Sequence, residues 1–575
     1  MGIPQLISTL EPYAVHGALD NDRVVIDGPA LAYHILHICN RYGIVQPSYQ
    51  LLGDTTIAWL DALVSRGVSV EAIYFDGHLP RAKRLVRMER MVKSLNQLKA
   101  SHSKDPPSGF SPAYLSTAKE TPPTLFSSTQ PLGKPFLPPS FHVPAIIDSL
   151  RFCHRYADLV HLVPGEADAY CAQRLSKSGG TVLTADSDLL VHDIGHGRVV
   201  FLRDIYLDGQ SRLACASFSP AHIREKVKLS PASEIRRLAY ERKRSPHHTL
   251  PQLLRDCAQP VVDTIGYTEF CHEYLDHETA PLPVSTAGGD IQIGSLDPRI
   301  SELILQLGNQ DIRANDPNDD MIFLPILLES PSRGSAWEQS TPIRQLAYTI
   351  ARWIIPGPSS TIQEYRRVNT NVQKGRQVHM LPKEAAKTRA QDLTSLMSEV
   401  KAELEGDAIQ AWQMLCLTLD ISHCREEGKK SHALQILEQC SQQTTLKRIS
   451  WDIIHFVAQL QAAYYSFRIL KQIMSLSAAE ETMPQLHSML CSLPSLAEFP
   501  TIESTLEFLR NSGEAQSLKI ITRLVPLPDA DPEEQSKRAS TPKKRKAVKQ
   551  HGRDKKAGPG NTATRNLFDI LSHDT

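Results

Sequence analysis

The sequence lacks any apolar run that approaches the roughly 20 residues a helix needs to cross a bilayer. No secretory signal pattern opens it, and no internal repeat recurs at a fixed period. Ten cysteines are scattered over 575 residues without a C-x-x-C pair, which excludes a dense disulfide framework. These absences predict a soluble, intracellular protein in a reducing compartment, with no membrane among its partners.

Net charge is also absent, because 63 Lys and Arg residues balance 63 Asp and Glu residues. The balance is uneven along the chain. Residues 537–556 hold ten basic residues and one acidic residue, which leaves 53 basic and 62 acidic residues elsewhere. We therefore expect a mildly acidic folded part and a separate, disordered basic tail over residues 526–575.

Two short motifs lie in this tail. The stretch "PKKRKAVK", residues 542–549, has the pattern of a nuclear import signal and predicts a nuclear protein that binds an import receptor. A nonspecific nucleic-acid-binding tail is the alternative. The terminal "RNLFDILS", residues 565–572, places Leu567, Ile570 and Leu571 on one helical face and predicts docking to a protein partner. The import motif rests on Pro542, Lys543, Lys544, Arg545 and Lys546.

Apolar residues make up 41% of the whole chain. This is enough to form the cores of two or three domains. Short apolar runs that read as buried strands alternate with helical patterns. Strand, helix, strand in that order predicts an α/β fold with a mostly parallel sheet flanked by helices. The predicted strands are "RVVIDG" (23–28), "AIYFDG" (72–77), "DLVHLVP" (158–164), "TVLTA" (181–185) and "RVVFL" (198–202).

Composition divides the chain further. Residues 1–100 and 145–217 carry the strand and helix alternation, while residues 101–144 are rich in Pro, Ser and Thr and predict a mobile inserted loop that sustains no packed element. From 218 to 525 the patterns are mainly helical.

Carboxylates follow four of the predicted strands, and the working groups of parallel sheets collect at the carboxyl ends of the strands. Acids that converge in one crevice repel each other unless cations neutralise them. Oxygen ligands without His or Cys favour Mg²⁺ or Mn²⁺, and two such ions can support displacement at phosphorus, which is phosphodiester hydrolysis. The six acids are Asp27, Asp76, Glu166, Asp168, Asp186 and Asp188.

Each acid also has an ordinary interpretation. Asp-Gly after a strand is a common turn. Glu166 and Asp168 suit the first turn of a helix, whose N-terminus favours negative charge. Asp193 is interpreted as a surface turn residue. The repetition at four strand ends is what favours the metal site.

The motifs "MGIPQL", "VVIDG", "YFDG", "PGEADAYCA" and "TADSDLL" resemble, in order and spacing, the XPG type of the flap-endonuclease superfamily of structure-specific 5′ nucleases. The resemblance covers about residues 1–100 and 145–205, and the remainder is similar to the asteroid branch. It implies a PIN-like sheet and Mg²⁺-dependent cleavage of flapped, branched or single-stranded DNA. It also implies that the six acids are metal ligands, with Asp168 in place of the commoner Glu, and that Gly2 lies near the site.

Basic residues dominate "GHLPRAKRLVRMERMVK", residues 77–93, a helix-like stretch. Lys83 and Arg90 are two turns apart and fall where the resemblance implies contact with the scissile phosphate. Such charges would offset negative charge in the transition state. A solvated basic helix is the alternative. The other basic residues predicted to bind nucleic acid are Arg81, Arg84, Arg87 and Lys93.

The sequence departs from the family pattern in two places. Gln5 replaces a usual Gly, and no Gly-x-Asp motif lies between Leu202 and Leu254, so the second metal ion is expected to be held weakly. Two hypotheses follow. The first is a nuclear metal-dependent endonuclease, and the second is a catalytically weak or inactive nucleic-acid-binding scaffold or post-transcriptional regulator. The residues do not distinguish DNA from RNA as the bound nucleic acid.

Overall fold

The chain divides into two units, residues 1–525 and 526–575. A computed structural model describes residues 3–80, 83–104, 121–126, 137–229, 234–275, 284–286, 289–308, 320–368, 371–372, 375–404, 408–440, 449–476, 483–511 and 514–525. All of them belong to the first unit. Gly2, Arg81, the import motif at 542–549 and the docking segment at 565–572 lie outside the described residues.

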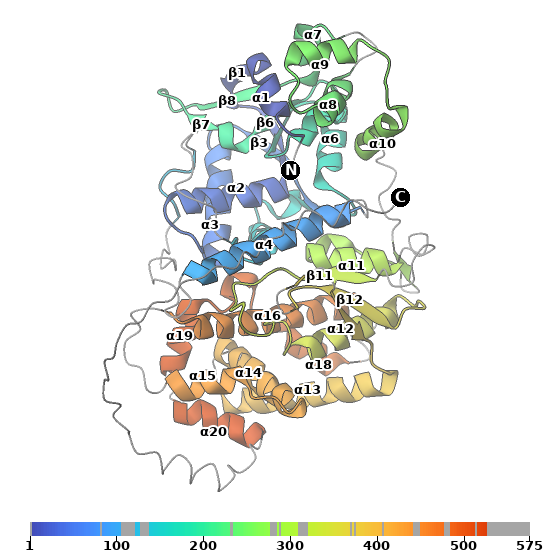
Figure 1. Cartoon of the computed structure of the whole chain (residues 1–575). Coiled ribbons are helices and arrows are strands. Elements are labelled where there is room, and N and C mark those ends of the chain that lie inside the picture. Colours follow the sequence, from blue (N-terminus) through green and yellow to red (C-terminus); the bar gives the residue numbers. More distant parts are fainter. Residues whose placement is uncertain are drawn as a thin grey trace, which may run out of the picture. The chain divides into compact units, whose positions relative to one another are not determined.

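A central eight-stranded sheet forms from the N-terminal part of the chain (Figure 1). Its order is β1-β8-β6-β5-β2-β3-β4, with β7 paired to β8. The strands β6, β5, β2, β3 and β4 are parallel, whereas β1, β7 and β8 pair antiparallel at one side, so the predicted mostly parallel α/β sheet is confirmed. The strands are β1 (Val15–Ala18), β2 (Arg23–Asp27), β3 (Ser69–Asp76), β4 (Val160–Val163), β5 (Thr181–Thr184), β6 (Arg198–Phe201), β7 (Tyr206–Leu207) and β8 (Leu213–Phe218).

Helices cover both faces of this sheet. Val25 of β2 packs in an apolar cluster with Leu175 and Leu238, from two helices of one face. Its neighbours Val24 and Ile26 are buried toward the opposite face, because alternate residues of a strand point to opposite sides. The helices are α1 (Leu6–Leu10), α2 (Gly28–Arg41), α3 (Tyr49–Val64), α4 (Arg84–Lys104), α5 (His142–Phe152), α6 (Ala167–Ser178), α7 (Pro220–Lys226), α8 (Ile235–Arg244), α9 (Leu250–Cys257) and α10 (Thr264–Leu275).

The glycines of the two Asp-Gly motifs are required by close packing. A Cβ on Gly28 would lie 2.6 Å from the ring of Phe75, and a Cβ on Gly77 would lie 2.3 Å from the carbonyl oxygen of Val163. The backbone N–H of Gly77 donates to that same carbonyl at 2.8 Å. At each Asp-Gly pair the chain therefore leaves its strand in close contact with a neighbouring element, where only glycine fits.

The C-terminal part, residues 284–525, is mainly helical as predicted, but it also contains a sheet with the order β11-β12-β13. The sequence concealed these strands because they are short, and because β12 carries a buried charge, Glu364, while β13 is mostly polar and exposed. The elements are β9 (Ser285–Thr286), β10 (Gly289–Asp290), α11 (Pro298–Gly308), β11 (Met321–Phe323), α12 (Thr341–Ile354), β12 (Thr361–Tyr365), β13 (Arg376–His379), α13 (Lys383–Glu403), α14 (Ala408–Glu426), α15 (His432–Cys440), α16 (Trp451–Met474), α18 (Pro484–Cys491), α19 (Ile502–Asn511) and α20 (Glu514–Leu524).

Short 3₁₀ turns complete the described elements. They are η1 (Glu11–Tyr13), η4 (Ala157–Leu159), η5 (Ser187–Leu190), η6 (Leu202–Asp204), η8 (Ile293–Ser295) and η10 (Leu496–Glu498). Within the described part of the chain, no helix is both long and apolar enough to span a bilayer. None of the nine cysteines whose side chains are described forms a disulfide.

The ends of the segment 101–144 are packed, which corrects the prediction that it sustains no packed element. The helix α4 continues through Lys104, and α5 begins at His142. Phe126 is buried against Trp59, with ring centroids 5.6 Å apart, and Phe141 is fully buried. The sequence did not indicate these contacts, because single aromatic residues among Pro and Ser can pack against the core without producing a helical or strand-like periodicity.

The C-terminal part is joined to the N-terminal part by polar and aromatic contacts along α16. Arg468 donates to both carboxylate oxygens of Asp148 on α5, each at 2.8 Å. Tyr465 donates to Asp297 at 2.7 Å, and its ring stacks on Phe141 with centroids 4.3 Å apart. The contacts of Arg468 with Asp148 and of Tyr465 with Phe141 tie residues more than 300 positions apart into one body, and the bond to Asp297 fixes Tyr465 within the C-terminal part.

A buried ion network holds the β11–β13 sheet to α12. Arg344 contacts both oxygens of Glu364, at 2.6 and 3.0 Å, and Arg366 contacts the same carboxylate at 2.9 Å. All three side chains are almost completely buried. Burial alone would raise the pKa of Glu364, but the two guanidinium groups outweigh it and lower the pKa to about 2.

We expect Glu364→Gln to destabilise the protein by about 3–5 kcal/mol near neutral pH, because it leaves buried guanidinium charges uncompensated. The folded-state pKa lies below the ordinary value of 4.5, so this stabilisation is complete above that pH and is lost as the pH falls toward 2. Denaturant unfolding of both proteins at several pH values measures the difference.

The control is Glu384→Gln, which removes an exposed carboxylate paired to Lys387 on α13. It should change the free energy of unfolding by less than about 0.5 kcal/mol. Equal losses for the two variants would contradict the importance assigned to the buried network.

Candidate metal site at the strand ends

The four strands that precede the predicted acids are neighbours in the sheet, in the order β5-β2-β3-β4. All four are parallel, so their carboxyl ends meet at one edge. Asp27 and Asp76 are the last residues of β2 and β3, and the other acids follow β4 and β5. The fold therefore brings the six predicted carboxylates to one place, although their role as metal ligands stays a prediction.

Backbone and hydroxyl donors fix Asp27 in this cluster. Its Oδ1 accepts from the N–H of Ala30 at 3.1 Å, which caps the N-terminus of α2. Its Oδ2 accepts from the hydroxyl of Thr184 at 2.6 Å, and the N–H of Asp186 donates to that hydroxyl at 3.0 Å. Thr184 thus links the ends of β2 and β5. Sequence reasoning missed it, although it opens the "TADSD" motif.

Similar bonds hold two further acids. Asp76 accepts from the N–H of Ala167 at 2.7 Å, so it orients the first turn of α6. Asp188 accepts from the N–H of Ile3 at 3.1 Å and donates its own N–H to Asp186 at the same distance. The segment that begins at Ile3 therefore reaches the cluster, which the sequence predicted only for Gly2.

Burial and mutual repulsion raise the pKa values of these carboxyl groups. Burial raises the pKa of Asp27 to about 7, and the charges of Asp76 and Asp186 add to the effect. Burial likewise raises the pKa of Asp76 to about 6 and that of Asp188 to about 7. The pKa of Asp168 is also well above its ordinary value, through burial and the charges of other cluster acids.

Lys83 contacts the cluster directly, with its Nζ 2.6 Å from the Oε1 of Glu166. Burial would lower the pKa of Lys83, but the charges of Glu166, Asp168 and Asp188 outweigh it and raise the pKa above its ordinary value. Lys83 is therefore a charged ammonium group at the edge of the cluster. One ammonium group cannot balance the remaining acids.

The residues of the cluster fit a divalent metal ion by their chemistry. Every donor is a carboxylate oxygen, which is the ligand type of Mg²⁺ and Mn²⁺. Buried carboxyl groups with raised pKa values show that negative charge at this place lacks sufficient compensation from the protein. Among the described residues, no three acidic, His or Cys side chains are already arranged as ligands of one ion.

Two of the predicted nucleic-acid-binding arginines on α4 face the C-terminal part. Arg84 donates to the hydroxyl of Tyr365 and lies over its ring, 5.2 Å from the centroid. Arg87 makes a bidentate ion pair with Glu302 at 2.6 Å and lies 4.8 Å from the centre of the Phe323 ring. Glu302 and Tyr365 thereby hold the first turns of α4 beside Lys83, and no sequence motif indicated them.

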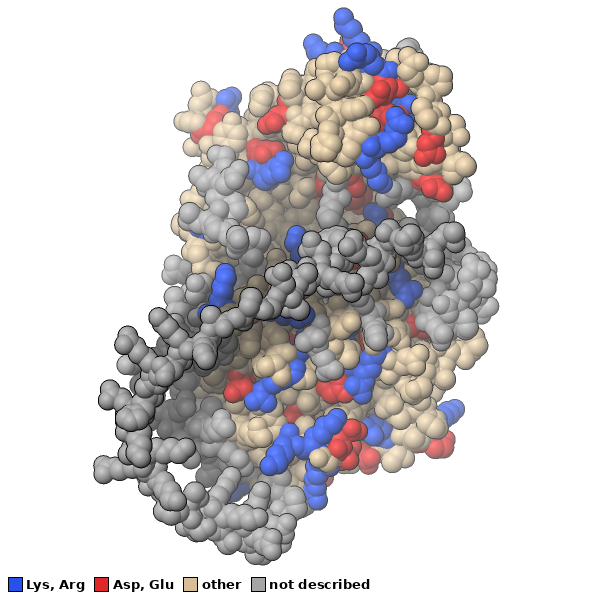
Figure 2. Space-filling view, viewed as in Figure 1, with Lys and Arg blue, Asp and Glu red and all other residues tan. Residues whose placement is uncertain are grey.

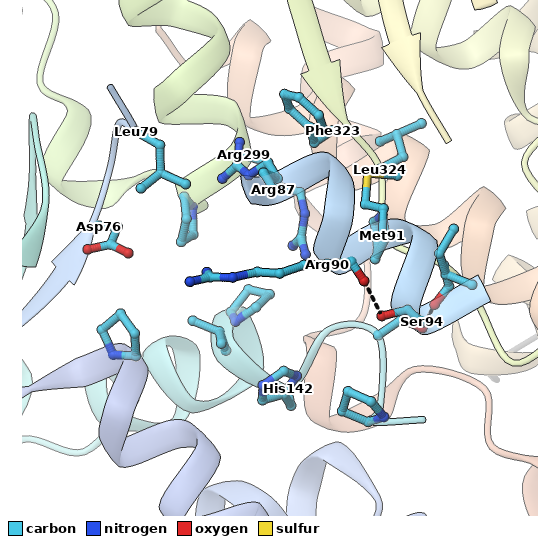
Figure 3. A pocket seen from close by; sticks show the side chains of 18 of the residues that line it. Asp76, Leu79, Arg87, Arg90, Met91, Ser94, His142, Arg299, Phe323 and Leu324 are labelled. Atoms are coloured by element: carbon cyan, nitrogen blue, oxygen red, sulfur yellow. Dashed lines mark hydrogen bonds between the residues drawn. The ribbon is translucent and has the colours of Figure 1, made fainter. Parts of the chain in front are cut away.

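Two other basic residues of α4, Lys93 and Arg90, lie away from the contacts with Glu302 and Tyr365. Lys93 is exposed on α4, and Arg90 projects into a cavity of about 290 Å³ (Figure 3). Asp76 lines the same cavity, so it adjoins the carboxylate cluster. Figure 2 shows basic and acidic side chains interspersed on the parts of this face that the grey residues leave uncovered. Asp193 is exposed and accepts from the N–H of Gly195, as its interpretation as a turn residue predicts.

This chain is similar in sequence to one known protein family and to one curated protein. Residues 138–380 match a family model described as XPG domain containing. Asteroid homolog 1 of Schizosaccharomyces pombe is 23% identical over 388 residues, which cover 65% of this chain and 65% of that protein. The chain thus matches slightly less than two thirds of that relative's length.

Two solved structures are also similar. The catalytic core of Rad2 is 13% identical and covers 48% of this chain and 86% of its own, with a TM-score of 0.24. Human GEN1 in complex with Holliday junction DNA is 13% identical and covers 54% of this chain and 74% of its own, with a TM-score of 0.28. Scores this low add nothing to the description of the site.

The motifs at the strand ends, the matching family model and the curated relative agree with one another. Over residues 138–380 the chain is similar to XPG-domain proteins, and over 65% of its length it is similar to an asteroid homolog.

Proposed function

We propose that this protein is a divalent-metal-dependent endonuclease that hydrolyses phosphodiester bonds in flapped, branched or single-stranded DNA. The observation that carries the proposal is the cluster of buried carboxylates supplied by four adjacent strand ends. Such groups raise one another's pKa values and destabilise the fold unless a cation joins them. A cluster kept at this cost to stability is best explained by metal binding.

The metal ions would be held by Asp27, Asp76, Glu166, Asp168, Asp186 and Asp188. When bound, Mg²⁺ or Mn²⁺ would supply an activated water and neutralise charge on the phosphate oxygens. Lys83 at the edge of the cluster and Arg90 in the adjoining cavity would hold the phosphate through charge-assisted hydrogen bonds. Ala30, Ala167 and Ile3 keep three of the carboxylates oriented through their N–H groups.

A scaffold without catalysis remains the second candidate, because one specific contact favours it. Glu166, a predicted ligand, is held at 2.6 Å by Lys83, which is itself predicted to bind the substrate. If that ion pair persisted with nucleic acid bound, both groups would be withdrawn from catalysis. The protein would then bind nucleic acid without cutting it.

Location and further partners are part of the proposal. The motif at 542–549 supports import into the nucleus, where DNA substrates occur, through an import receptor. The segment 565–572 would dock to a protein partner through its apolar face. RNA is the alternative substrate, and cleavage of matched DNA and RNA strands distinguishes the two.

We expect purified protein to cut 5′-flap, splayed or single-stranded DNA with Mg²⁺ or Mn²⁺, and expect Asp186→Ala together with Asp188→Ala to reduce the rate at least about 100-fold. Gel analysis of end-labelled substrates measures the rates. Asp193→Ala, which removes an exposed acid on the same loop, is the matched control and should cut normally. Binding without cleavage by the unmodified protein would support the scaffold, and cleavage that survives the double change would exclude this site.

Binding of Mn²⁺ should strengthen as the pH rises from 5.5 to 8. The ion needs ionised carboxylates, and the pKa values of Asp27 and Asp188 near 7 and of Asp76 near 6 mean that protons occupy the site at the lower pH. We expect an increase in affinity on the order of 10- to 100-fold by isothermal titration calorimetry. Buffers with different heats of ionisation should reveal proton release, and the absence of both effects would argue against a metal site here.

A further inference from the structure

The basic helix α4 packs on one part of the molecule and presents a charge to the other. Lys83, directly before its first residue, contacts the carboxylate cluster of the N-terminal part at 2.6 Å. The buried side chains of α4 are Met91, Leu95 and Leu98. Among the described buried residues, the rest of their apolar cluster is Leu137 and members of the C-terminal part. The position of α4 at the carboxylate cluster therefore depends on how the two parts meet.

The two parts meet beside the site through α11. A Cβ on Gly77, the residue after Asp76, would lie 3.0 Å from the Oγ of Ser301, so α11 packs closely on the end of β3. The next residue, Glu302, is 6% exposed, and both of its carboxylate oxygens lie 2.6 Å from the Nη1 of Arg87 on α4. Two adjacent residues of α11 thus contact the β3 end and the basic helix.

The start of α11 is itself held by α16. Asp297, directly before α11, accepts from the hydroxyl of Tyr465 at 2.7 Å. The backbone N–H of Asp297 donates to the side chain of Gln472 on the same helix, also at 2.7 Å. Because α11 is anchored in this way, Glu302 has a stable base from which to hold Arg87.

We propose that Glu302 is a positioning residue for phosphate binding by Lys83, an inference that rests on the proposed nucleic-acid substrate. Glu302 acts through Arg87, which lies four residues after Lys83 and therefore about one helical turn along the same side. Without this ion pair the first turns of α4 lose a buried, charged contact, and Lys83 is held less firmly at the strand ends. Glu302 does not need to touch the substrate in this role.

A purely electrostatic role for Glu302 predicts a different result. Removing an acid beside the phosphate-binding groups makes their surroundings more positive, which should tighten the binding of any polyanion. The positioning role predicts that the contribution of Lys83 to binding is lost. A double-mutant cycle separates the two, because independent charge effects add and cancel when Lys83→Ala is compared with and without Glu302.

The test measures binding of one labelled single-stranded DNA oligonucleotide to the full chain by fluorescence anisotropy, at one ionic strength. Ca²⁺ is present as a hard cation that takes oxygen ligands, and a gel checks that the oligonucleotide stays whole. We expect Lys83→Ala to weaken binding about tenfold in the otherwise unmodified protein, the effect of one charge-assisted contact. In the Glu302→Gln protein the same change should weaken binding less than about twofold. Equal losses in the two proteins would overturn the proposal.

Asp148→Asn is the matched control. It breaks the ion pair with Arg468, which also joins the N-terminal part to the C-terminal part and makes no hydrogen bond to α4 among the described residues. Asp148→Asn and Glu302→Gln should both lower the free energy of unfolding. Lys83→Ala should still weaken binding about tenfold beside Asp148→Asn. Loss of the Lys83 effect in this control would assign it to general destabilisation and overturn the role of Glu302.

An exchange of the two charges tests for rescue. Arg87→Glu combined with Glu302→Arg rebuilds the ion pair and should restore the effect of Lys83→Ala, and a folded exchange protein without that effect would overturn the proposal. If Glu302→Gln does not fold, Tyr365→Phe removes only the hydroxyl that accepts from Arg84 and should reduce the Lys83 effect in the same direction.

The two levels of the proposal fail in different ways. If the unmodified protein does not bind the oligonucleotide, the proposed function fails, and the role of Glu302 fails with it. If the protein binds and Lys83→Ala weakens binding equally with and without Glu302, only the positioning role is removed.

Discussion

The repulsion among carboxylates at the ends of four parallel strands is the constraint on which the site depends. Parallel neighbours place their carboxyl ends at one edge, and each of these strands is followed by acid. The N–H groups of Ala30, Ala167 and Ile3 and the hydroxyl of Thr184 offset part of the cost. The raised pKa values show that the compensation is incomplete, which is the electrostatic condition that favours divalent cations.

A second constraint comes from the C-terminal part, which packs on α4. Met91, Leu95 and Leu98 of α4 share an apolar cluster with β11 and α16. The first turns of the same helix are held by Glu302 and Tyr365, one turn from Lys83. The basic helix therefore has its position set by residues more than 200 positions later in the chain. The C-terminal part thus forms part of the surroundings of the site.

Much of the fold could be predicted from the sequence because local patterns suffice for it. "RVVID" and "TVLT" carry Val, Ile and Leu at their central buried positions, and Asp-Gly marks where a strand must turn against a neighbour. The strands β11 to β13 could not be predicted, because β11 has only three residues, the buried Glu364 of β12 reads as a surface residue, and β13 is mostly polar and exposed. The anchoring of Phe126 and Phe141 was hidden for a related reason, since a single buried aromatic produces no period.

The sequence by itself determined the α/β class, the order of the strands along the chain and the identity of the six acids, because each depends on residues close together in the chain. Only the tertiary structure decided which groups surround those acids. Lys83 pairs with Glu166, and Arg84 and Arg87 contact residues of the C-terminal part. Arg90 and Arg299 line one cavity. All of these contacts join residues that are distant in sequence. Such contacts leave no local pattern, because their partners are chosen by packing in three dimensions.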